Sequence, residues 1–373
     1  MPTSSPTPHV VQVAVYTPVH SGVGAPLSYT HTCALVPGTL VRVPLGTRVL
    51  MGVVWQATDT AAALPDNTKL RAIDAVMEGL APLNTHWQRL VSFAARYYQR
   101  SVGEIALAGL PPALRDMTAE QLAKRLQPPK AKKLAPKAPA ALPQQAQHVV
   151  DNSTNAPPDG ASPITLSAEQ QSVCRQIESE RGPFLLFGST GSGKTEVYMH
   201  VVQRALDADP QAQALVMVPE INLTPQLQER FTARFTALYG PHAVVSMHSG
   251  MTDVQRLKSW LAAHTGQARI VLGTRMSVFA SLPGLKVIVV DEEHDPSYKQ
   301  QEGARYSARD LALWRGHDCA AKVILGSATP SLESWHASEP AIGRYLRLHM
   351  PSRIGAAALP RLRMVDMSQQ PKK

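Results

Sequence analysis

Hydrophobic and polar positions divide the chain into two regions with different patterns. Near the N-terminus, the short β-branched runs "VVQVAVY", "TLVRVPLG" and "VLMGVVWQ" lie between glycine and proline residues, which is typical of strands joined by turns. The segment "THWQRLVSFAARYYQR" follows and has apolar residues at helical spacing, namely Trp87, Leu90, Val91, Ala94 and Ala95. These patterns predict a compact, β-rich α+β domain over residues 1–110.

A second pattern extends over residues 164–343. The apolar runs "FLLFG", "ALVMVP", "RIVLGT", "VIVVDEE" and "AKVILGSAT" alternate there with helical stretches. Continuous apolar runs of this kind are typical of parallel strands that helices cover on both faces. The fold class that we predict is therefore α/β, with a parallel-sheet domain preceded by the smaller β-rich domain.

The remaining segments carry weaker patterns. Residues 111–163 contain "PPKAKKLAPKAPAALPQQAQHVVDNSTNAPPDGASP", which is rich in Pro, Ala and Lys and poor in large apolar residues, so we predict a linker. Residues 344–373 are short, basic and rich in turn residues. We predict that they form a connection leading out of the parallel-sheet domain, with "LRMVDM" as a strand.

Composition and charge narrow the class of protein only slightly. The chain has 373 residues and a net charge of +9, and the excess of basic residues lies outside residues 164–343, which is compatible with nucleic-acid binding. Three cysteines lie far apart without a C-x-x-C pair, so we expect neither a disulfide framework nor a zinc site. No apolar run reaches 18 residues and no secretory signal pattern opens the chain, so we expect a cytoplasmic protein without a membrane partner.

A glycine-rich motif follows the run "FLLFG" and precedes a helical stretch. Its sequence is "GSTGSGKT", in which Gly188, Gly191 and Gly193 allow backbone N–H groups to approach phosphates. Lys194 would reach the β- and γ-phosphates of ATP, and the Thr195 hydroxyl would ligate magnesium. The predicted ATP-binding residues of this loop are Gly188, Ser189, Thr190, Gly191, Ser192, Gly193, Lys194 and Thr195.

An acidic cluster closes a later apolar run, in "LKVIVVDEEHD". At the carboxyl end of a strand, Asp291 would hold magnesium and Glu292 would polarise the attacking water. His294 can form a hydrogen bond toward either side of this cluster. Together with Lys194, these three residues are the predicted catalytic set.

Polar residues also follow three other apolar runs. Glu220 and Thr224 come after "ALVMVP", Thr274 and Arg275 come after "IVLG", and Ser327 ends "VILGS". Because the carboxyl ends of parallel strands meet at one edge of a sheet, we expect these side chains to line one crevice.

The segment after the acidic cluster, "DPSYKQQEGARYSARDLALWRG", combines aromatic and basic residues. Aromatic rings can stack on unpaired bases of any sequence, and basic side chains can contact phosphates. The predicted DNA-contacting residues here are Tyr298, Lys299, Arg305, Tyr306 and Arg309, together with Thr274 and Arg275. The alternative is that the aromatic residues of the segment, Trp314 above all, pack into the core.

The motifs G-S-T-G-S-G-K-T, P-E-I-x-L-T-P-Q, G-T-R-x-S, D-E-E-H-D and G-S-A-T-P-S, in this order, resemble those of superfamily 2 helicases. With the aromatic segment, they are similar to the replication restart helicases. The resemblance implies a P-loop, RecA-like first motor lobe at residues 164–343 and an adenine contact by Gln170 in "LSAEQQ". It further implies that Tyr29 in "PLSY" and Gly46 in "VRVPLG" contact the 3′ end of DNA.

The resemblance also implies an activity. We expect an ATP- and magnesium-dependent 3′ to 5′ DNA helicase that recognises stalled forks, with forked DNA carrying a 3′ end and single-stranded DNA as ligands. Primosome proteins and single-stranded DNA-binding protein are the expected protein partners. Members of the family also carry a winged helix, a zinc-binding insertion and a second motor lobe. In this sequence we expect the winged helix to be absent or degenerate, and neither the zinc ligands nor the second lobe is found, so the chain resembles an N-terminal fragment.

Two other functions remain open. One is a DNA-binding fragment that binds ATP without unwinding DNA, which the missing second lobe favours. The other is an unrelated P-loop enzyme such as a nucleotide kinase, against which the G-S-A-T motif and the aromatic segment argue. A DNA-stimulated ATPase assay distinguishes the kinase from the helicase.

Overall fold

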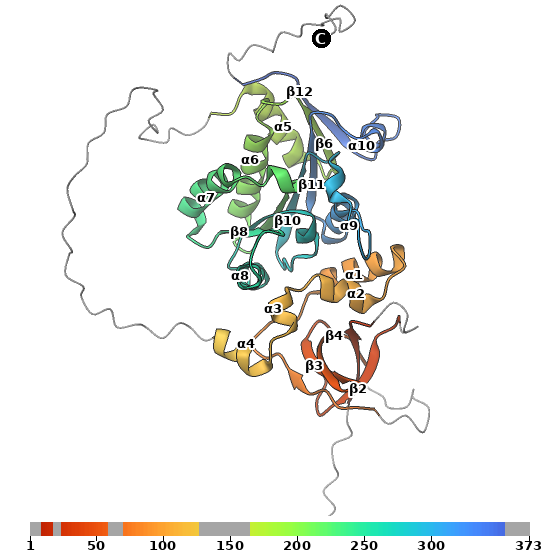
Figure 1. Ribbon diagram of the computed structural model, residues 1–373. Helices are drawn as coiled ribbons and strands as arrows, with labels where there is room; N and C mark the ends of the chain where they lie inside the picture. Colours follow the sequence, from red (N-terminus) through yellow and green to blue (C-terminus); the bar gives the residue numbers. More distant parts are fainter. Residues whose placement is uncertain (1–8, 18–23, 59–69, 127–164, 355–373) are drawn as a thin grey trace, which may run out of the picture.

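The computed structural model describes residues 9–17, 24–58, 70–126 and 165–354. These residues form two domains, which lie one below the other in Figure 1. We call the described part of residues 9–126 the first domain and residues 165–354 the second domain. None of the described helices is both long and apolar enough to cross a bilayer.

The first domain is built on a five-stranded antiparallel sheet. Its strands are β1 (His9–Val15), β2 (Leu27–His31), β3 (Leu40–Leu45), β4 (Arg48–Thr58) and β5 (Ala75–Val76), in the order β2-β1-β4-β3-β5. The three β-branched runs became β1, β3 and β4, as their composition predicted. Side chains from strands β1, β3 and β4, including Val11, Val41 and Val54, pack together in one apolar core on this sheet.

Four helices complete the first domain: α1 (Thr85–Tyr97), α2 (Val102–Ala108), α3 (Pro112–Arg115) and α4 (Ala119–Leu126). Helix α1 begins at the predicted place because the Asn84 side chain accepts a hydrogen bond from the Trp87 backbone nitrogen. The predicted linker at 111–163 starts too early, since Leu114 and Leu122 are fully buried and hold α3 and α4 on this domain. The rest of the predicted linker, from residue 127, lies outside the described residues.

The second domain contains a seven-stranded, all-parallel sheet, which confirms the predicted α/β class. Its strands are β6 (Phe184–Gly188), β7 (Gln213–Met217), β8 (Val244–Met247), β9 (Ile270–Gly273), β10 (Leu285–Asp291), β11 (Lys322–Ser327) and β12 (Leu346–Met350), in the order β12-β6-β11-β10-β7-β9-β8. Each of the five apolar runs contains one of these strands. Strand β12 pairs with β6, so residues 346–350 belong to the sheet rather than to a connection. The predicted strand "LRMVDM" lies outside the described residues.

Helices cover both faces of the parallel sheet. Helices α5 (Ala168–Ser179), α6 (Lys194–Ala208) and α7 (Pro225–Tyr239) share one apolar core with alternate strand residues such as Val216 and Val289. Helices α8 (Asp253–His264) and α9 (Ala308–Cys319) share the other core with residues such as Met217 and Val290. A short helix, α10 (Leu332–Ala337), precedes β12. Alternation of side chains along each strand therefore fills two separate cores.

The second of these cores continues into the first domain. Helices α1 and α2 lie between the antiparallel sheet and the second domain in Figure 1, and α1 packs on α9 while α3 packs on α8. Trp87 of α1 is fully buried, and its indole nitrogen donates a hydrogen bond to the Phe279 carbonyl oxygen at 2.8 Å. Gly109 is in close contact here, since an added Cβ would lie 3.1 Å from the Phe279 side chain. The two domains are thus joined by an apolar interdomain interface.

Candidate functional site

The glycine-rich loop joins β6 to α6 at the carboxyl edge of the parallel sheet. Gly191 and Gly193 have φ values of 83° and 84°, a left-handed conformation that side chains with a Cβ disfavour. The Lys194 ammonium group donates a hydrogen bond to the Gly188 carbonyl oxygen at 2.9 Å and is largely buried. The loop therefore curls around its own lysine at the N-terminus of a 15-residue helix, where a phosphate is favoured.

Two observations describe what the loop leaves open to a ligand and what holds it in place. The buried Ser192 hydroxyl oxygen has no hydrogen-bond partner among the described residues, so it is available to a ligand. Residues 351–354 hold the loop from the other side: the Ser189 hydroxyl donates to the Pro351 carbonyl oxygen at 3.4 Å, and the Ile354 nitrogen donates to the Gly191 carbonyl oxygen at 3.0 Å. Thr195 begins the helix beside Lys194, and Thr190 lies at the exposed turn of the loop.

Gln170 lies next to this loop, on the first turn of α5. Its side-chain oxygen accepts a hydrogen bond from the Ser167 nitrogen at 2.8 Å, which forms a capping box. Its side-chain nitrogen donates to the Gly193 carbonyl oxygen at 3.3 Å. In this conformation Gln170 therefore positions the phosphate loop, and its contact with adenine stays a prediction.

Asp291 ends β10 on the same edge of the sheet. Its carboxylate accepts a hydrogen bond from the Tyr198 hydroxyl at 2.9 Å. Burial, and then the neighbouring Glu292 carboxylate, raise the pKa of Asp291, while Tyr198 and Lys194 oppose the rise. Tyr198 reaches Asp291 only because residue 326 is glycine, since a Cβ there would lie 1.6 Å from the tyrosine hydroxyl. Sequence reasoning missed Tyr198, although its position four residues after Lys194 places it on the same face of α6.

Glu292 and His294 connect Asp291 to the next strand. Glu292 has a φ of 45°, so it is the turn residue that redirects the chain after β10. His294 Nδ1 lies 3.7 Å from the Glu292 carboxylate and 2.8 Å from the Ser327 hydroxyl, and its Nε2 lies 3.4 Å from the Thr329 hydroxyl. The histidine therefore links the D-E-E-H motif to the G-S-A-T motif, toward both sides as predicted from its position.

Glu293, which sequence reasoning did not single out, has a structural role. Its side chain is fully buried and lies 3.2 Å from the Arg309 guanidinium. It also accepts hydrogen bonds from the Ser331 nitrogen at 2.7 Å and from the Ser334 hydroxyl at 2.8 Å. In the run of three acidic residues, Asp291 and Glu292 thus lie on the nucleotide side, whereas Glu293 forms an ion pair in the interior. The residue type alone gave no signal for this division.

The aromatic residues of the following segment are buried. Tyr298 is 2% exposed and donates from its hydroxyl to the Asp291 carbonyl oxygen at 2.7 Å. Tyr306 is 9% exposed and packs edge-to-face on Phe279, and burial raises its pKa to about 12. In this conformation neither ring presents a face to a base, so their stacking on DNA stays a prediction that requires the segment to move.

The other residues of this segment divide between the interdomain interface and solvent. Trp314 stacks on Phe93 of α1 with ring centroids 4.6 Å apart, which agrees with the packing alternative for that residue. The Lys299 ammonium lies 5.5 Å from the ring centroid of Tyr98. Arg305 is exposed, with a φ of 42°. Of the three predicted phosphate contacts, Arg305 and Lys299 lie at the surface and Arg309 is engaged with Glu293.

The G-T-R motif lies beside the aromatic segment and holds it. Arg275 donates hydrogen bonds to the carbonyl oxygens of Ser297, at 2.8 Å, and Lys299, at 3.1 Å. Thr274 is buried at the end of β9. Both residues line a cavity of about 70 Å³ together with Glu220, whereas Thr224 and Ser327 do not line it, so the structure brings together only part of the expected crevice.

In the first domain, the buried Tyr29 contacts the strand that leads to Gly46. The Tyr29 hydroxyl donates to the Pro44 carbonyl oxygen at 3.2 Å, and Gly46 forms the turn between β3 and β4 with a φ of 61°. Arg71, which sequence reasoning missed, donates to the Gly46 carbonyl oxygen at 2.7 Å. A Cβ added at Gly46 would meet no atom within 4 Å, so that side of the turn is open to a ligand.

Comparison with known proteins identifies both domains. Residues 167–337 match the family model of the DEAD/DEAH box helicase, and residues 12–111 match that of the PriA 3′DNA-binding domain. Replication restart protein PriA of Rickettsia felis is 31% identical over 347 residues, which cover 92% of this chain and 47% of that protein. The PriA of Bacillus subtilis is 38% identical over 213 residues, covering 56% of this chain and 25% of that protein.

Among solved structures, RecG bound to a three-way DNA junction aligns with 53% of this chain and 25% of that chain, at 20% identity and a TM-score of 0.40. That likeness is too low to carry an argument. The chain spans less than half the length of the two PriA relatives named above. Both family models, and an alignment with the Rickettsia felis protein that covers 92% of this chain, show that the chain is similar over its two domains to replication restart protein PriA.

Proposed function

We propose that this chain is the ATP-binding portion of a 3′ to 5′ DNA helicase that acts at stalled replication forks and initiates restart. One observation carries the proposal: three motif-bearing strands, β6, β11 and β10, are neighbours in the parallel sheet. Their carboxyl ends bring Lys194, Asp291 and His294 to one edge. A nucleotide kinase has no need of the His294 link to Ser327 at 2.8 Å, whereas a motor that responds to a second ligand requires connected motifs.

The residues present fit ATP with magnesium. Lys194 would pair with the β- and γ-phosphates, and Thr195 and Asp291 would hold the metal. Magnesium, when bound, would neutralise charge that develops on the transferred phosphoryl group. Glu292 would accept a proton from the attacking water. His294 is hydrogen-bonded to Ser327 and lies beside Glu292. A ligand that moves the end of β11 would therefore change the orientation of Glu292 through His294.

The first domain would recognise the 3′ end of a DNA strand. Gly46 and Arg71 would form a small surface in which Arg71 supplies positive charge beside an accessible backbone turn, and the buried Tyr29 would support that turn through its hydrogen bond to Pro44. A continuing single strand would pass the crevice at Thr274 and Arg275. Forked DNA and single-stranded DNA are therefore the proposed ligands. Primosome proteins and single-stranded DNA-binding protein are proposed as partners, in the cytoplasm, on the family resemblance alone.

The first test is ATP hydrolysis with and without single-stranded DNA. We expect stimulation by DNA in the wild-type chain and loss of ATP binding, by about 100-fold, in Lys194→Ala, because charge-assisted hydrogen bonds to the phosphates are lost. Glu292→Gln should bind ATP and fail to hydrolyse it. Calorimetry that finds equal ATP affinity in wild type and Lys194→Ala contradicts the assignment.

A second assay separates the helicase from the alternative, a DNA-binding module that binds ATP without unwinding. Fork unwinding by the chain favours the motor, and ATP-dependent DNA binding without unwinding favours the module. For the first domain, a fork whose 3′ end carries a phosphate should bind more weakly than the same fork with a free hydroxyl, and equal binding would remove the 3′-end assignment.

A further inference from the structure

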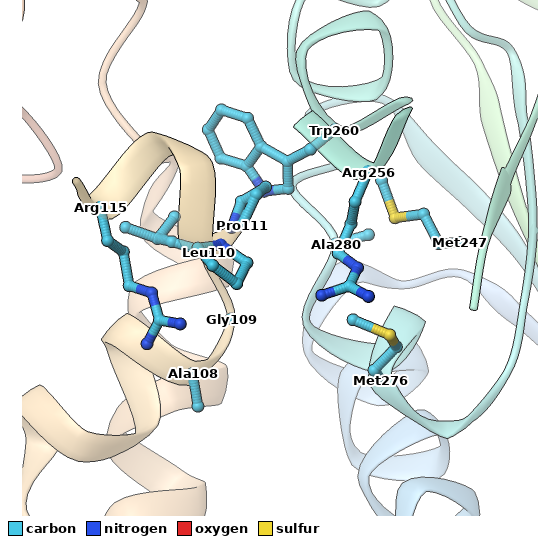
Figure 2. Close-up of a pocket in the computed structure, with 11 residues that line it drawn as sticks. Ala108, Gly109, Leu110, Pro111, Arg115, Met247, Arg256, Trp260, Met276 and Ala280 are labelled. Atoms are coloured by element: carbon cyan, nitrogen blue, oxygen red, sulfur yellow. The ribbon is translucent and has the colours of Figure 1, made fainter. Parts of the chain in front are cut away.

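A cavity of about 160 Å³ lies at the interdomain interface, away from the nucleotide loop. Figure 2 shows the first domain on one side, with Leu110, Pro111 and Arg115, and the second domain on the other, with Arg256, Trp260 and Met276. The close contact between α3 and α8 forms its wall. No residue of the predicted site had pointed to this place.

Two buried donor groups beside this cavity lack partners within the described part of the chain. Trp260 is 2% exposed, and its indole nitrogen has no hydrogen-bond partner there. The same holds for the Arg256 Nε atom, although the Nη2 atom of Arg256 donates to the Ser249 and Met251 carbonyl oxygens at 3.3 and 3.2 Å. Buried N–H groups without acceptors are rare in native proteins, and each is destabilising unless a ligand satisfies it.

The lining also has an unusual charge balance. Arg115 enters from α3 and Arg256 from α8, and the described lining contains no acidic side chain. The Asp253 carboxylate lies 3.5 Å from Arg256 but is itself 59% exposed. Such a site offers hydrogen-bond donors and positive charge, so the complementary ligand carries negative acceptor oxygens.

The remaining lining and the size narrow the ligand further. Met247, Met276 and Pro111 give an apolar surface beside the two guanidinium groups. A cavity of about 150 Å³ accommodates a group the size of benzene, so the space suits one phosphate with part of its sugar rather than a whole nucleotide. Met276 also lines the strand-end crevice that contains Thr274 and Arg275. A strand in that crevice would therefore pass directly in front of this cavity.

We propose that the cavity binds one phosphodiester of a nucleic-acid strand where the strand crosses from the first domain to the second. Arg115 and Arg256 would contact the phosphate from opposite domains, and the Trp260 N–H would donate to one of its oxygens after a small adjustment of the wall. The choice of a nucleic acid over an acidic peptide rests on the proposed function. The bound strand would tie the two domains together at α3 and α8.

The test neutralises one phosphate of the strand at a time. Single-stranded oligonucleotides carrying one methylphosphonate linkage at successive positions are titrated against the chain by fluorescence anisotropy. We expect one position at which neutralisation weakens wild-type binding by about tenfold, which corresponds to a hydrogen bond to a charged group. In Arg115→Gln, the same linkage should cost less than about twofold, because its partner is already absent.

Two further variants make the result specific. Arg344→Gln removes an exposed positive charge near β12, and it should retain the full tenfold effect at the sensitive linkage. Trp260→Phe keeps a buried ring and removes only the N–H donor, so it should reduce the effect to an intermediate value. Thermal unfolding of each variant verifies folding, and Arg115→Lys replaces Arg115→Gln if the latter is unfolded, with a partial effect expected.

Three outcomes overturn the proposal. If every linkage costs the same in wild type and in Arg115→Gln, while DNA still binds and stimulates ATP hydrolysis, the phosphate site is wrong and the proposed function stands. A short poly-aspartate peptide tests the other class of ligand: if it binds the wild type but not Arg115→Gln, and each methylphosphonate linkage weakens DNA binding equally in both proteins, the cavity is a peptide site. If the wild-type chain binds no single-stranded DNA at low salt, the proposed function and this site are both wrong.

Discussion

The phosphate loop and the aromatic segment at residues 296–309 lie at the same edge of one sheet, yet they are built differently. The loop takes its shape from residues within it, since Gly191 and Gly193 set the backbone and Lys194 bonds to Gly188 six residues earlier. The aromatic segment takes its shape from distant residues. Tyr98, for example, accepts a hydrogen bond from the Ser307 nitrogen at 3.0 Å across 209 positions.

This difference explains why the two regions were predicted with unequal success. A short motif whose partners are its own neighbours carries its geometry in the sequence. Aromatic and basic residues that depend on remote partners show the same sequence pattern whether they face DNA or the protein interior. In this structure the segment connects the acidic cluster to the first domain, through Tyr298 on one side and Lys299 on the other.

The largest expected effect comes from the ion pair inside the segment. Arg309→Gln leaves the fully buried Glu293 carboxylate without its cation, so we expect the free energy of unfolding to fall by about 3 kcal/mol. Urea denaturation followed by circular dichroism measures it. Arg305→Gln, four positions earlier and exposed, is the matched control: it should leave stability unchanged and weaken DNA binding with a smaller salt slope. Equal stability of both variants would contradict the difference in roles.

The next effect tests the nucleotide side. Gly326→Ala places a Cβ 1.6 Å from the Tyr198 hydroxyl, so Tyr198 must leave Asp291 and the core must rearrange, at about 2 kcal/mol. Tyr198→Phe removes the clashing oxygen. The loss in the free energy of unfolding of the double variant should therefore be smaller than the sum of the losses of the two single variants. If the two losses simply add, residues 198 and 326 do not contact one another.

A smaller effect concerns the link between the two regions. Tyr298→Phe removes the hydrogen bond to the Asp291 carbonyl oxygen and keeps the buried ring, so we expect a loss of about 1 kcal/mol in the free energy of unfolding. Tyr97→Phe changes the same group on a side chain that is 67% exposed and should have no measurable effect. If Tyr298→Phe were as stable as Tyr97→Phe, the segment would not be fastened to the acidic cluster.

The smallest effect is a pH dependence at the interdomain interface. His264 is buried, and its ring nitrogens lie 2.8 Å from the Ser281 hydroxyl and 2.9 Å from the Ala81 carbonyl oxygen of the first domain. Burial lowers the pKa of His264 below its usual value of 6.5, while the bond to Ala81 partly opposes this. The unfolded chain therefore binds a proton first as pH falls, and stability present above pH 6.5 is lost below it.

Thermal unfolding at pH 7.5 and at pH 5.5 measures this dependence. His264→Gln should show a smaller decrease in unfolding temperature between the two pH values than the wild type. His242→Gln, at an exposed position, should retain the wild-type decrease. A wild-type decrease that persists unchanged in His264→Gln would assign the effect to another group.

The sequence predicted those strands that lie in conspicuous apolar or β-branched runs. The five apolar runs of the second domain each contain a strand, since continuous burial requires continuous apolar sequence. Strands β2, β5, β8 and β12 were not predicted, because sequences such as "LSYTH" and "LRLHM" mix polar with apolar residues and their pairing is set by neighbours in space. Helix α4 was missed because only Leu122 of its eight residues is buried, so its sequence resembles a polar linker.

The candidate site was predictable where a chemical role demands a residue type at a strand end. Lys194, Asp291 and Glu292 lie where the motifs placed them. The partners that make the site work were not visible in this way: Tyr198 resembles any core tyrosine, and Glu293 resembles its catalytic neighbours. The same applies to Arg115 and Arg256, which come together only because the two domains meet.

The apolar core that crosses the interdomain interface has a consequence for how the molecule unfolds. Core residues of α1, such as Trp87 and Leu90, belong to the same cluster as Val290 and Leu311 of the second domain. Neither domain can expose its side of this cluster without exposing the other. We therefore expect the described domains to behave as one cooperative unit, with a single heat-absorption peak in calorimetry, and a ligand that stabilises either domain should raise the melting temperature of both.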